Sequence, residues 1–486
     1  MKGMIEAYFR DNSLVNQQIQ SFNEFIDYGM QRVVDRIGVI KTNVEGFEIK
    51  LGKIRVDPPR FYEIRGGPRN ILPSEARMRN LTYSSPVHLE MIPVFNGIEK
   101  HVYSDVFIGE IPVMVRSKLC HLSSMTDQEL IEMGEDPLDP GGYFIINGSE
   151  RVLVSLEDLV PNKLMTTIEE DGTIISKVFS TRHGFRARCA IRRTKEGHWL
   201  LDFPSAPPNL PLIPVLHVLG AESQDELFEN FETDILEIKN DLLYNLEIDK
   251  QRDQDPVEYL SKRLSPGQPR EFRENRMWHL LDNYLLPHIG VDPSDRKKKI
   301  FYLAKMAERA TLVYHKKMLP DDKDHYGNKR IKLAGDLMED LFRYAFQFLV
   351  RDIIYQASRA DVRGRRLQVH TLVRQDALTD RIMYSMATGN WVAGQTGVSQ
   401  LLDRTSFIAT LSHRRRVVSP LSKRHPHFKA RDLHGTHYGR ICPSETPEGP
   451  SCSLVKNLAL FAEVSIGVDG GEVESLLKSM GVKEAE

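Results

Sequence analysis

Residues 412–449 read SHRRRVVSPLSKRHPHFKARDLHGTHYGRICPSETPEG, and the rest of the chain can be organised around this segment. The segment is strongly basic, because Asp432 is the only acid between Arg404 and Arg440. Its cationic side chains are Arg414, Arg415, Arg416, Lys423, Arg424, Lys429, Arg431 and Arg440. Guanidinium forks and lysine point charges match phosphate oxygens, so this composition predicts a surface for a polyphosphate. A solvated basic loop is the alternative interpretation.

Aromatic and acidic side chains lie among and beside these cations. Phe428, Tyr438 and several histidines offer planar faces on which nucleic-acid bases could stack. Proline and glycine on both sides indicate a loop of defined shape. Glu445 and Glu448 could be paired carboxylates for acid–base catalysis, but we interpret them as structural acids that anchor nearby arginines. Composition therefore leaves both nucleic-acid binding and a solvated loop open, and we predict no catalytic residue in this segment.

Length and composition are those of an ordinary globular chain. The sequence has 486 residues, enough for about three domains, and a formal net charge of −2. Any nucleic-acid surface must therefore be a local patch that is balanced by acid elsewhere. The four cysteines form no C-x-x-C pair, which argues against a zinc site and fits a reducing cytoplasm. No leader or membrane-spanning run is visible, so we expect a cytoplasmic protein.

The rest of the chain alternates between helix and sheet patterns. Apolar spacing predicts helices over residues 1–40, and short alternating runs predict strands over 46–115 and a meander over 164–203. Asn147-Gly148 between two apolar runs predicts a tight hairpin. The remaining predicted helices span 224–245, 256–264, 271–285, 294–317, 331–360 and 376–388.

Two local patterns receive a structural interpretation. Asp322 and Asp324 begin like a calcium-binding loop, but Leu333 stands where the bidentate glutamate is required, so no metal site is predicted. Glu150 and Arg151 are neighbours in the sequence, and we expect them to form a surface ion pair.

The amino-acid sequence of residues 412–449 closely resembles the fork region of the second-largest subunit of multisubunit RNA polymerases. This subunit is called beta in bacteria and B in archaea. Residues 141–152, which read GGYFIINGSERV, are similar to another stretch of that subunit. The resemblance runs from near residue 10 to about residue 465, whereas the family's subunit continues for a comparable length. In some archaea this B-type subunit is encoded as two chains, and the sequence resembles the N-terminal piece, B double-prime.

The resemblance implies an α+β, multidomain fold with mixed helices and antiparallel sheets. The family's protrusion would be split, and its lobe would be inserted between the two parts. The implied domains are 1–155 (protrusion, first part), 156–319 (lobe), 320–375 (protrusion, second part), 376–465 (fork) and 466–486 (start of the following external domain or a tail).

The resemblance also implies a function as a subunit of DNA-directed RNA polymerase, the nucleotidyltransferase that joins ribonucleoside triphosphates on a DNA template. This chain would form one wall of the active cleft, contact template DNA and nascent RNA, and help to separate the strands. The cleft-wall residues would be Gln400, Asp403, His413, His437, Tyr438, Glu445 and Glu448. Catalytic Mg²⁺ would be bound by the largest subunit, and this chain would bind no cofactor. The expected partners are a B-prime chain, the largest subunits and the assembly subunits.

Two other classes of function remain open at this point. A stand-alone module for single-stranded nucleic acid would bind DNA by itself, with a steep dependence on salt. An assembly scaffold without a catalytic role would bind proteins and leave nucleic acid untouched. Stoichiometric association with other polymerase chains would distinguish the polymerase hypothesis from both.

Overall fold

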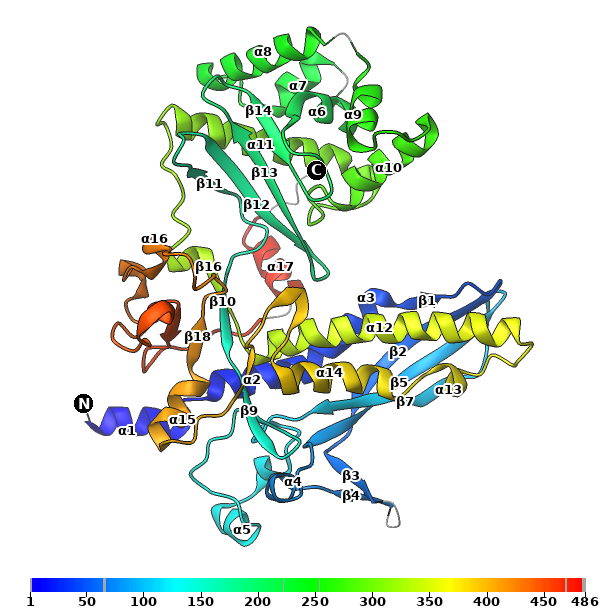
Figure 1. Ribbon diagram of the computed structural model, residues 1–486, viewed down its shortest axis with the longest axis vertical. Coiled ribbons are helices and arrows are strands. Elements are labelled where there is room, and N and C mark those ends of the chain that lie inside the picture. Colours follow the sequence, from blue (N-terminus) through cyan, green and yellow to red (C-terminus); the bar gives the residue numbers. More distant parts are fainter. Residues whose placement is uncertain (1, 64–66, 222, 253, 468–469, 483–486) are drawn as a thin grey trace. The chain divides into compact units, whose positions relative to one another are not determined.

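The computed structural model describes residues 2–63, 67–221, 223–252, 254–467 and 470–482, and it divides into two compact units (Figure 1). The discontinuous unit comprises residues 1–158 and 331–486, and the inserted unit comprises residues 159–330. Each unit has its own buried apolar cluster. The mixture of helices and antiparallel sheets confirms the predicted α+β class.

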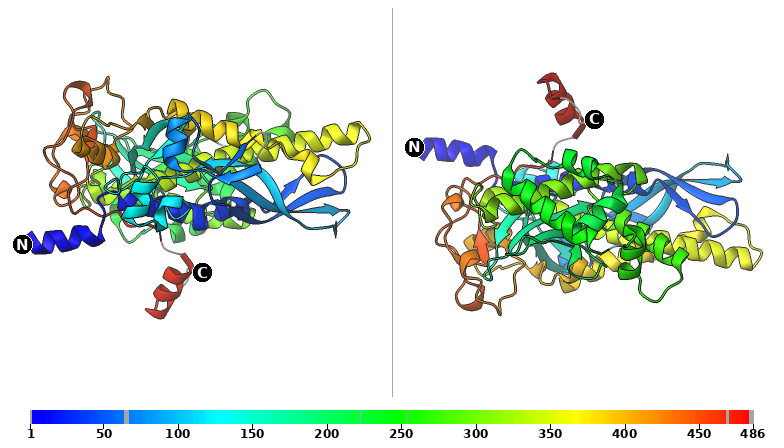
Figure 2. Two further views of the ribbon diagram at one scale, coloured as in Figure 1. Left: turned by 90° about the horizontal axis from the view of Figure 1, so that it is seen from below. Right: turned by 90° about the horizontal axis from the view of Figure 1, so that it is seen from above.

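The main sheet of the discontinuous unit is antiparallel and carries helices on one face. Its strand order is β1, β2, β5, β7, and the short β6 also pairs with β5. Helices α12 and α14 run alongside this sheet (Figures 1 and 2). The elements are β1 (Val39–Lys41), β2 (Phe47–Val56), β5 (Ser84–Phe95), β6 (Ile98–Glu99), β7 (Tyr103–Pro112), α12 (Ala334–Val362), α13 (Val369–Leu372) and α14 (Asp376–Thr388).

The N-terminal helical region is confirmed, but it is interrupted. It consists of α1 (Lys2–Asp11), α2 (Asn16–Glu24), a π-helical turn (Phe25–Gly29) and α3 (Met30–Ile37). Buried side chains of α2, the π turn and α3 belong to the same apolar cluster as α12. This packing explains why the apolar spacing in the sequence continues through the interruption.

Two small sheets join segments that are distant in sequence. The hairpin of β8 (Phe144–Ile146) and β9 (Ser149–Leu153) turns at Asn147 and Gly148, which both have positive φ, so the predicted tight turn is confirmed. β17 (Ser399–Leu401) adds to the edge of this hairpin by pairing with β9. β10 (Ser155–Leu159) pairs in parallel with β18 (Arg416–Val418), which also pairs with β19 (Val455–Asn457).

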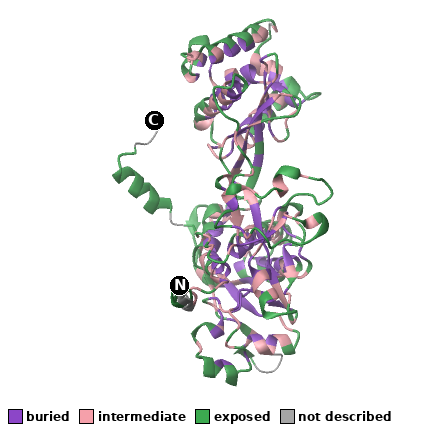
Figure 3. Cartoon of the chain, turned by 90° about the vertical axis from the view of Figure 1, so that its left-hand side faces the viewer, coloured by how far each residue is buried: buried purple, intermediate pink, exposed green. Residues whose placement is uncertain are grey.

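Short elements complete the described part of the discontinuous unit. They are β3 (Arg60–Glu63), β4 (Gly67–Asn70), α4 (Pro73–Met78) and α5 (Asp127–Glu132). Near the C-terminus, α17 (Gly470–Ser479) has no buried residue and is exposed along its length (Figure 3).

The inserted unit consists of a meander followed by helices, as the sequence predicts for 164–203 and the region after it. Its strands pair antiparallel in chain order. They are β11 (Met165–Ile168), β12 (Ile174–Arg182), β13 (Phe185–Arg193), β14 (Trp199–Asp202) and β15 (Leu210–Pro211). The helices are α6 (Leu212–Leu219), α7 (Gln224–Asn230), α8 (Leu236–Lys250), α9 (Pro256–Leu264), α10 (Arg270–Asn283) and α11 (Arg296–Tyr314).

One predicted helix of the inserted unit needs correction. The predicted helix 224–245 is two helices, because the chain leaves the helix at Phe231, whose ring stacks on Trp199 in the core.

The residues just after 319 pack within the inserted unit. Asp321 donates a backbone hydrogen bond to Thr166, and its carboxylate accepts one from Arg309 at 2.7 Å. The assignment of the family's named domains to residue ranges stays a prediction.

Candidate nucleic-acid interface

The basic segment, residues 399–458, begins and ends in strands that are anchored in the discontinuous unit. β17 is held by β9, and β18 lies between β10 and β19. Helix α15 (Phe407–Arg414) begins after Ser406, whose hydroxyl accepts a hydrogen bond from the Ala409 backbone. Between β18 and β19 the chain forms α16 (Phe428–Arg431) and 3₁₀ turns at Gly435–His437 and Gly449–Ser451. Regular pairing therefore fixes the two ends of this segment and leaves its middle as a long connection.

Arg414, at the end of α15, is buried, with 1% of its side chain exposed. Its guanidinium donates hydrogen bonds to Asp139 at 3.1 Å and to the carbonyl oxygens of Thr410 and Gly141. Burial disfavours the charge of Asp139, but the hydrogen bond from Tyr143 and the charge of Arg414 outweigh it, so the pKa of Asp139 lies below its usual value. This arrangement corrects the prediction that Arg414 contacts phosphate, because its guanidinium faces the interior.

Arg415 is also buried and has a structural contact set. It donates hydrogen bonds to the carbonyl oxygens of Leu14 at 2.6 Å, Ala459 at 2.6 Å and Leu460 at 3.2 Å. The guanidinium thus connects the segment that precedes α2 to the residues that follow β19. The prediction that Arg415 contacts phosphate is corrected for the same reason as that for Arg414.

A third buried cation, Lys456, connects the strands β10, β18 and β19. Lys456 on β19 donates hydrogen bonds to both carboxylate oxygens of Glu157, at 3.3 and 3.1 Å, and to the hydroxyl of Ser419 at 3.0 Å. Both partners of this ion pair have side chains less than a tenth exposed. Such a pair costs desolvation energy, so its main contribution is to fix how β10, β18 and β19 fit together.

Glu150 forms an ion-pair network with two arginines, and neither is its neighbour in sequence. Its carboxylate accepts hydrogen bonds from Arg77 Nε at 2.8 Å and from Arg404 Nε at 2.6 Å, and Arg404 also reaches Asp139 at 3.2 Å. Although burial raises the pKa of Glu150, these two guanidinium groups hold it below its usual value. The predicted Glu150–Arg151 ion pair is therefore wrong, because adjacent residues of a β-strand point to opposite faces.

His413, Gln400 and Asp403, three of the predicted cleft-wall residues, lie together, and their place in a cleft wall stays a prediction. The His413 Nε2 lies 3.0 Å from the Gln400 side-chain oxygen, and its Nδ1 accepts a hydrogen bond from the Asp403 backbone at 3.2 Å. These partners require a neutral ring with the proton on Nε2. Burial, with the nearby charge of Arg416, lowers the pKa of His413 to about 4. The ring is thus a fixed hydrogen-bonding group at neutral pH.

The hydrogen-bond partners of Glu445 are neutral groups, and its negative charge also acts on Arg415, one of the arginines beside which the sequence predicted it to lie. Its carboxylate accepts hydrogen bonds from the hydroxyl of Ser412 and from the amide of Asn457 at 3.2 Å. Glu448 is exposed in a turn, and His437 is buried at the end of a 3₁₀ turn. Glu445 therefore connects the end of α15 to β19.

Residues 420–440 form the basic loop, where most of the remaining predicted cations lie. The exposed cations of the loop are Lys423, Arg424, Lys429 and Arg440. Arg431 is half-buried and holds the loop's shape by donating hydrogen bonds to the carbonyl oxygens of Pro426, Pro450 and Cys452. Tyr438 is 92% exposed, and Phe428 is 77% exposed. The loop therefore exposes cations and aromatic rings together. Arg414, Arg415 and Lys456 are buried instead, and these three cations with their contacts are called the buried base of the segment.

The sequence alone did not identify the distant residues that pair with these buried side chains. Asp139, Glu157 and Gln18 hold the basic segment in place, yet each lies more than two hundred residues before its partner. Their only signal in the sequence is a charged or amide side chain beside an apolar run, which is too common to select them.

The described residues contain no group of three or more histidine, cysteine or acidic side chains that could hold a metal ion. In the same residues, no helix is both long and apolar enough to cross a bilayer.

Comparisons with known proteins place this architecture in a family. Residues 13–380 match the model described as RNA polymerase beta subunit, and residues 400–464 match that of RNA polymerase Rpb2, domain 3. The chain is 48% identical to the DNA-directed RNA polymerase subunit Rpo2N of Methanocaldococcus jannaschii, with 99% of each chain covered. It is 45% identical to Rpo2N of Halobacterium salinarum, covering 98% of this chain and 95% of that one.

A longer relative shows how much of the undivided subunit the chain matches. Identity to the DNA-directed RNA polymerase subunit Rpo2 of Saccharolobus solfataricus is 45% over 99% of this chain but only 43% of that protein. Together with the matches to the two family models, these similarities confirm the resemblance found in residues 412–449. The chain belongs to the RNA polymerase beta subunit family, and within it to the archaeal Rpo2N type, which corresponds to the N-terminal half of the undivided Rpo2.

Proposed function

We propose that this RNA polymerase subunit forms one wall of the active cleft and that its basic loop contacts the sugar–phosphate backbone of melted template DNA and of the RNA–DNA hybrid. The observation that carries the proposal is that some cations of the segment are buried and others are exposed. Arg414, Arg415 and Lys456 are buried and build a fixed base, whereas Lys423, Arg424, Lys429 and Arg440 are exposed on the loop above it. A rigid mount that presents exposed cations is what backbone contact requires.

The contacts would position nucleic acid without reading its sequence. Lysine and arginine neutralise phosphates whatever the base, so they supply affinity and orientation. The exposed rings of Tyr438 and Phe428 offer stacking faces for unpaired bases. Cations and rings on one loop would favour single strands over duplex and so help to keep the strands apart.

Chemistry would take place on another chain. RNA synthesis by two-metal phosphoryl transfer needs clustered carboxylates, and the described residues of this chain hold no such cluster. We assign Mg²⁺ to the largest subunit, and we take the largest subunits, the B-prime chain that completes the second-largest one and the assembly subunits as partners in the cytoplasm. Within the enzyme, Gln400, Asp403 and His413 would form a neutral, hydrogen-bonded part of the wall.

The test uses polymerase reconstituted with the variant K423Q/R424Q/K429Q. We expect assembly to be unchanged, promoter opening to be impaired, and the salt dependence of DNA binding to become shallower by roughly 0.7 to 0.9 per lost phosphate contact. A matched control is K41Q/K53Q/K100Q, which neutralises three exposed lysines of the same unit outside the loop. Unchanged opening and salt dependence in the first variant would exclude the proposed role of the loop.

The same preparation distinguishes the alternatives. A chain that never associates stoichiometrically with other polymerase subunits, yet binds single-stranded DNA alone, would indicate a stand-alone binding module. A chain that assembles normally but whose loop variant changes no property of DNA binding would indicate a scaffold.

A further inference from the structure

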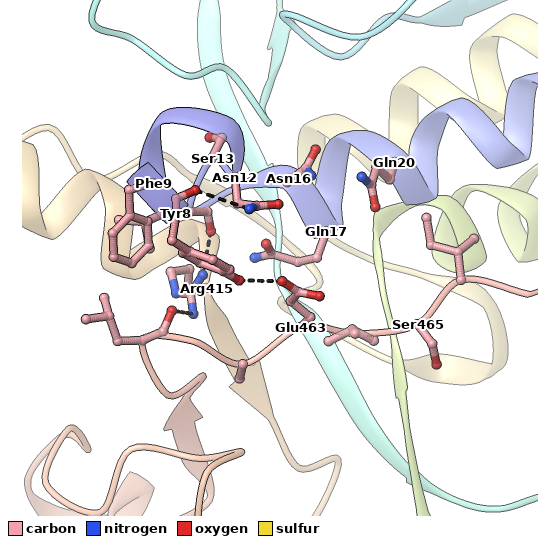
Figure 4. A pocket seen from close by; sticks show the side chains of 15 residues that line it. Tyr8, Phe9, Asn12, Ser13, Asn16, Gln17, Gln20, Arg415, Glu463 and Ser465 are labelled. Carbon is pink, nitrogen blue, oxygen red and sulfur yellow. Dashed lines mark hydrogen bonds between the residues drawn. The ribbon is translucent and has the colours of Figure 1, made fainter. Parts of the chain in front are cut away.

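A cavity of about 510 Å³ lies between the N-terminal helices and the segment that follows β19 (Figure 4). One wall is formed by α1 and the start of α2, and the other by Leu460 and residues 462–466, with Arg415 between them. All of these residues belong to the discontinuous unit. Among the described lining residues, Arg415 is the only one that the sequence predicted to meet nucleic acid or to form the cleft wall. The cavity is therefore distinct from the basic loop.

Gln17 is the observation that points to a ligand. It is 7% exposed, it lines the cavity, and its side-chain Nε2 is buried without a hydrogen-bond partner. The adjacent Gln18 shows what a buried glutamine normally achieves. Its Nε2 donates to Ser155 and to the Arg414 carbonyl oxygen, and its Oε1 accepts from the Ala334 backbone. Because an unpaired buried amide is costly, Gln17 is placed for an acceptor that the chain does not itself supply.

The polar lining is rich in amides, and its one cation is already bonded. Asn12, Asn16 and Gln20 accompany Gln17 on the helical wall. Arg415 is the one cation among the described lining residues, and it donates to three carbonyl oxygens. Glu463 adds a carboxylate, which would repel an anion. These features disfavour a phosphate or nucleic-acid ligand, which would need available positive donors.

The apolar part of the lining combines two aromatic rings at one end, Tyr8 and Phe9, with aliphatic side chains that include Leu460 and Val464 on the opposite wall. A third ring, Phe461, packs against these two. Phe9 stacks on Phe461 with ring centroids 5.5 Å apart, and Tyr8 packs edge-on against both rings. The hydroxyl of Tyr8 donates a hydrogen bond to Glu463, which ties the helical wall to the opposite wall. An occupant would therefore meet carboxamides along one side and an aromatic surface at one end.

We propose that this cavity binds an extended polypeptide segment of another polymerase subunit. A peptide unit presents a carbonyl acceptor and an N–H donor, which match the donor and acceptor of a carboxamide. In this arrangement a backbone carbonyl oxygen of the partner accepts from Gln17 Nε2, and an apolar side chain of the partner packs on Phe9 and Leu460, which both line the cavity. The inference rests on the proposed function, because it takes the partner from the same enzyme.

The direct test is photo-crosslinking in polymerase reconstituted from purified subunits. A benzophenone amino acid replaces Gln20, which is exposed and lines the cavity, and in a parallel preparation it replaces Gln268, which is exposed in the inserted unit. We expect position 20 to crosslink to one short peptide of another subunit that position 268 does not reach. Crosslinks from position 20 only within this chain, only to a second copy, or only to nucleic acid would overturn the proposal.

A second measurement separates binding from folding. Gln17→Met keeps the length of the side chain but removes the unpaired amide, so the full chain should melt at an unchanged or higher temperature. Its affinity for the remaining subunits should fall roughly three- to tenfold, the loss expected for one backbone hydrogen bond. Gln18→Met is the matched control, and it should lower the melting temperature because Gln18 is fully bonded within the chain. Equal affinity of the Gln17→Met chain and the unmodified chain would overturn the proposal.

The two proposals can fail separately. A chain that does not assemble with polymerase subunits at all would contradict the proposed function. A chain that assembles and opens promoters, but whose cavity reaches no other subunit, would contradict this inference alone.

Discussion

The buried base and the exposed loop of the basic segment are both cationic, but their side chains lie in opposite surroundings. In the base, Arg414 and Arg415 point inward and pair with Asp139 and with backbone carbonyl oxygens. In the loop, Lys423 and Arg424 are exposed. The comparison shows that a run of cations does not identify its own binding residues. A guanidinium that is buried and bonded acts as a structural cross-link, and one that stays in water remains available to a ligand.

The largest expected effect is a loss of unfolding free energy when Arg414, one of the buried cations, is replaced. Replacing Arg414 with methionine leaves Asp139 buried without its main cation, and breaking such a pair typically costs about 3 to 5 kcal/mol of unfolding free energy. Asp139 keeps contacts with Arg404 and Tyr143, so we expect about 3 kcal/mol. Urea denaturation of the full chain measures it. Arg440→Met in the loop is the matched control, and an equal loss for both variants would break the comparison.

An intermediate effect should appear in the pH dependence of the unfolding free energy, through His413 next to Arg414. The folded chain lowers the pKa of His413 from the ordinary 6.5 to about 4. Between these two pH values the unfolded chain therefore binds one more proton than the folded chain. Stability from this group is complete above pH 6.5 and is lost as the pH falls towards 4. The full shift would correspond to about 3.4 kcal/mol at about 1.36 kcal/mol per pKa unit, and solvent screening reduces the expected difference to on the order of 2 kcal/mol. Unfolding free energies of the unmodified chain and of His413→Gln, measured across this window, should show a shallower slope for the variant. Parallel slopes would contradict the assignment.

The smallest expected effect is on the stability of the loop variants. K423Q/R424Q/K429Q removes exposed charges and no buried contact, so its unfolding free energy should stay within about 0.5 kcal/mol of the unmodified chain. The measurement is again urea denaturation, carried out beside the Arg414 variant. A loss comparable to that of Arg414→Met would show that the loop is part of the base and would remove the distinction drawn above.

Local patterns in the sequence predicted local structure well. The hairpin at Asn147-Gly148, the meander at 164–203 and the helices at 256–264 and 376–388 all follow from turn chemistry and apolar spacing. The helix at 224–245 was wrong, because the core contact of Phe231 with Trp199 overrides its helical spacing.

The site was predicted less completely, for a physical reason. The sequence shows which residues carry charge, but burial decides which charges stay in water, and burial depends on contacts between distant segments. Arg414, Arg415 and Arg416 are consecutive, yet the first two are buried and the third is only half-buried. Their partners Asp139, Gly141 and Leu14 could not be paired with them from spacing alone.

The hydrogen bond from Gln18 to the Arg414 carbonyl oxygen spans 396 residues of chain, which has a consequence for biosynthesis. At ribosomal speeds of about 5 to 20 residues per second, the N-terminal helices wait on the order of tens of seconds for the residues that complete their surroundings. The inserted unit is continuous and can close its core as soon as it has emerged. Helix α2 and the Asn147-Gly148 hairpin can pack on each other through Phe22 and Phe144, but the surfaces that α12 and β17 cover stay open while the inserted unit folds. We therefore expect the nascent chain to depend most on chaperones during that interval.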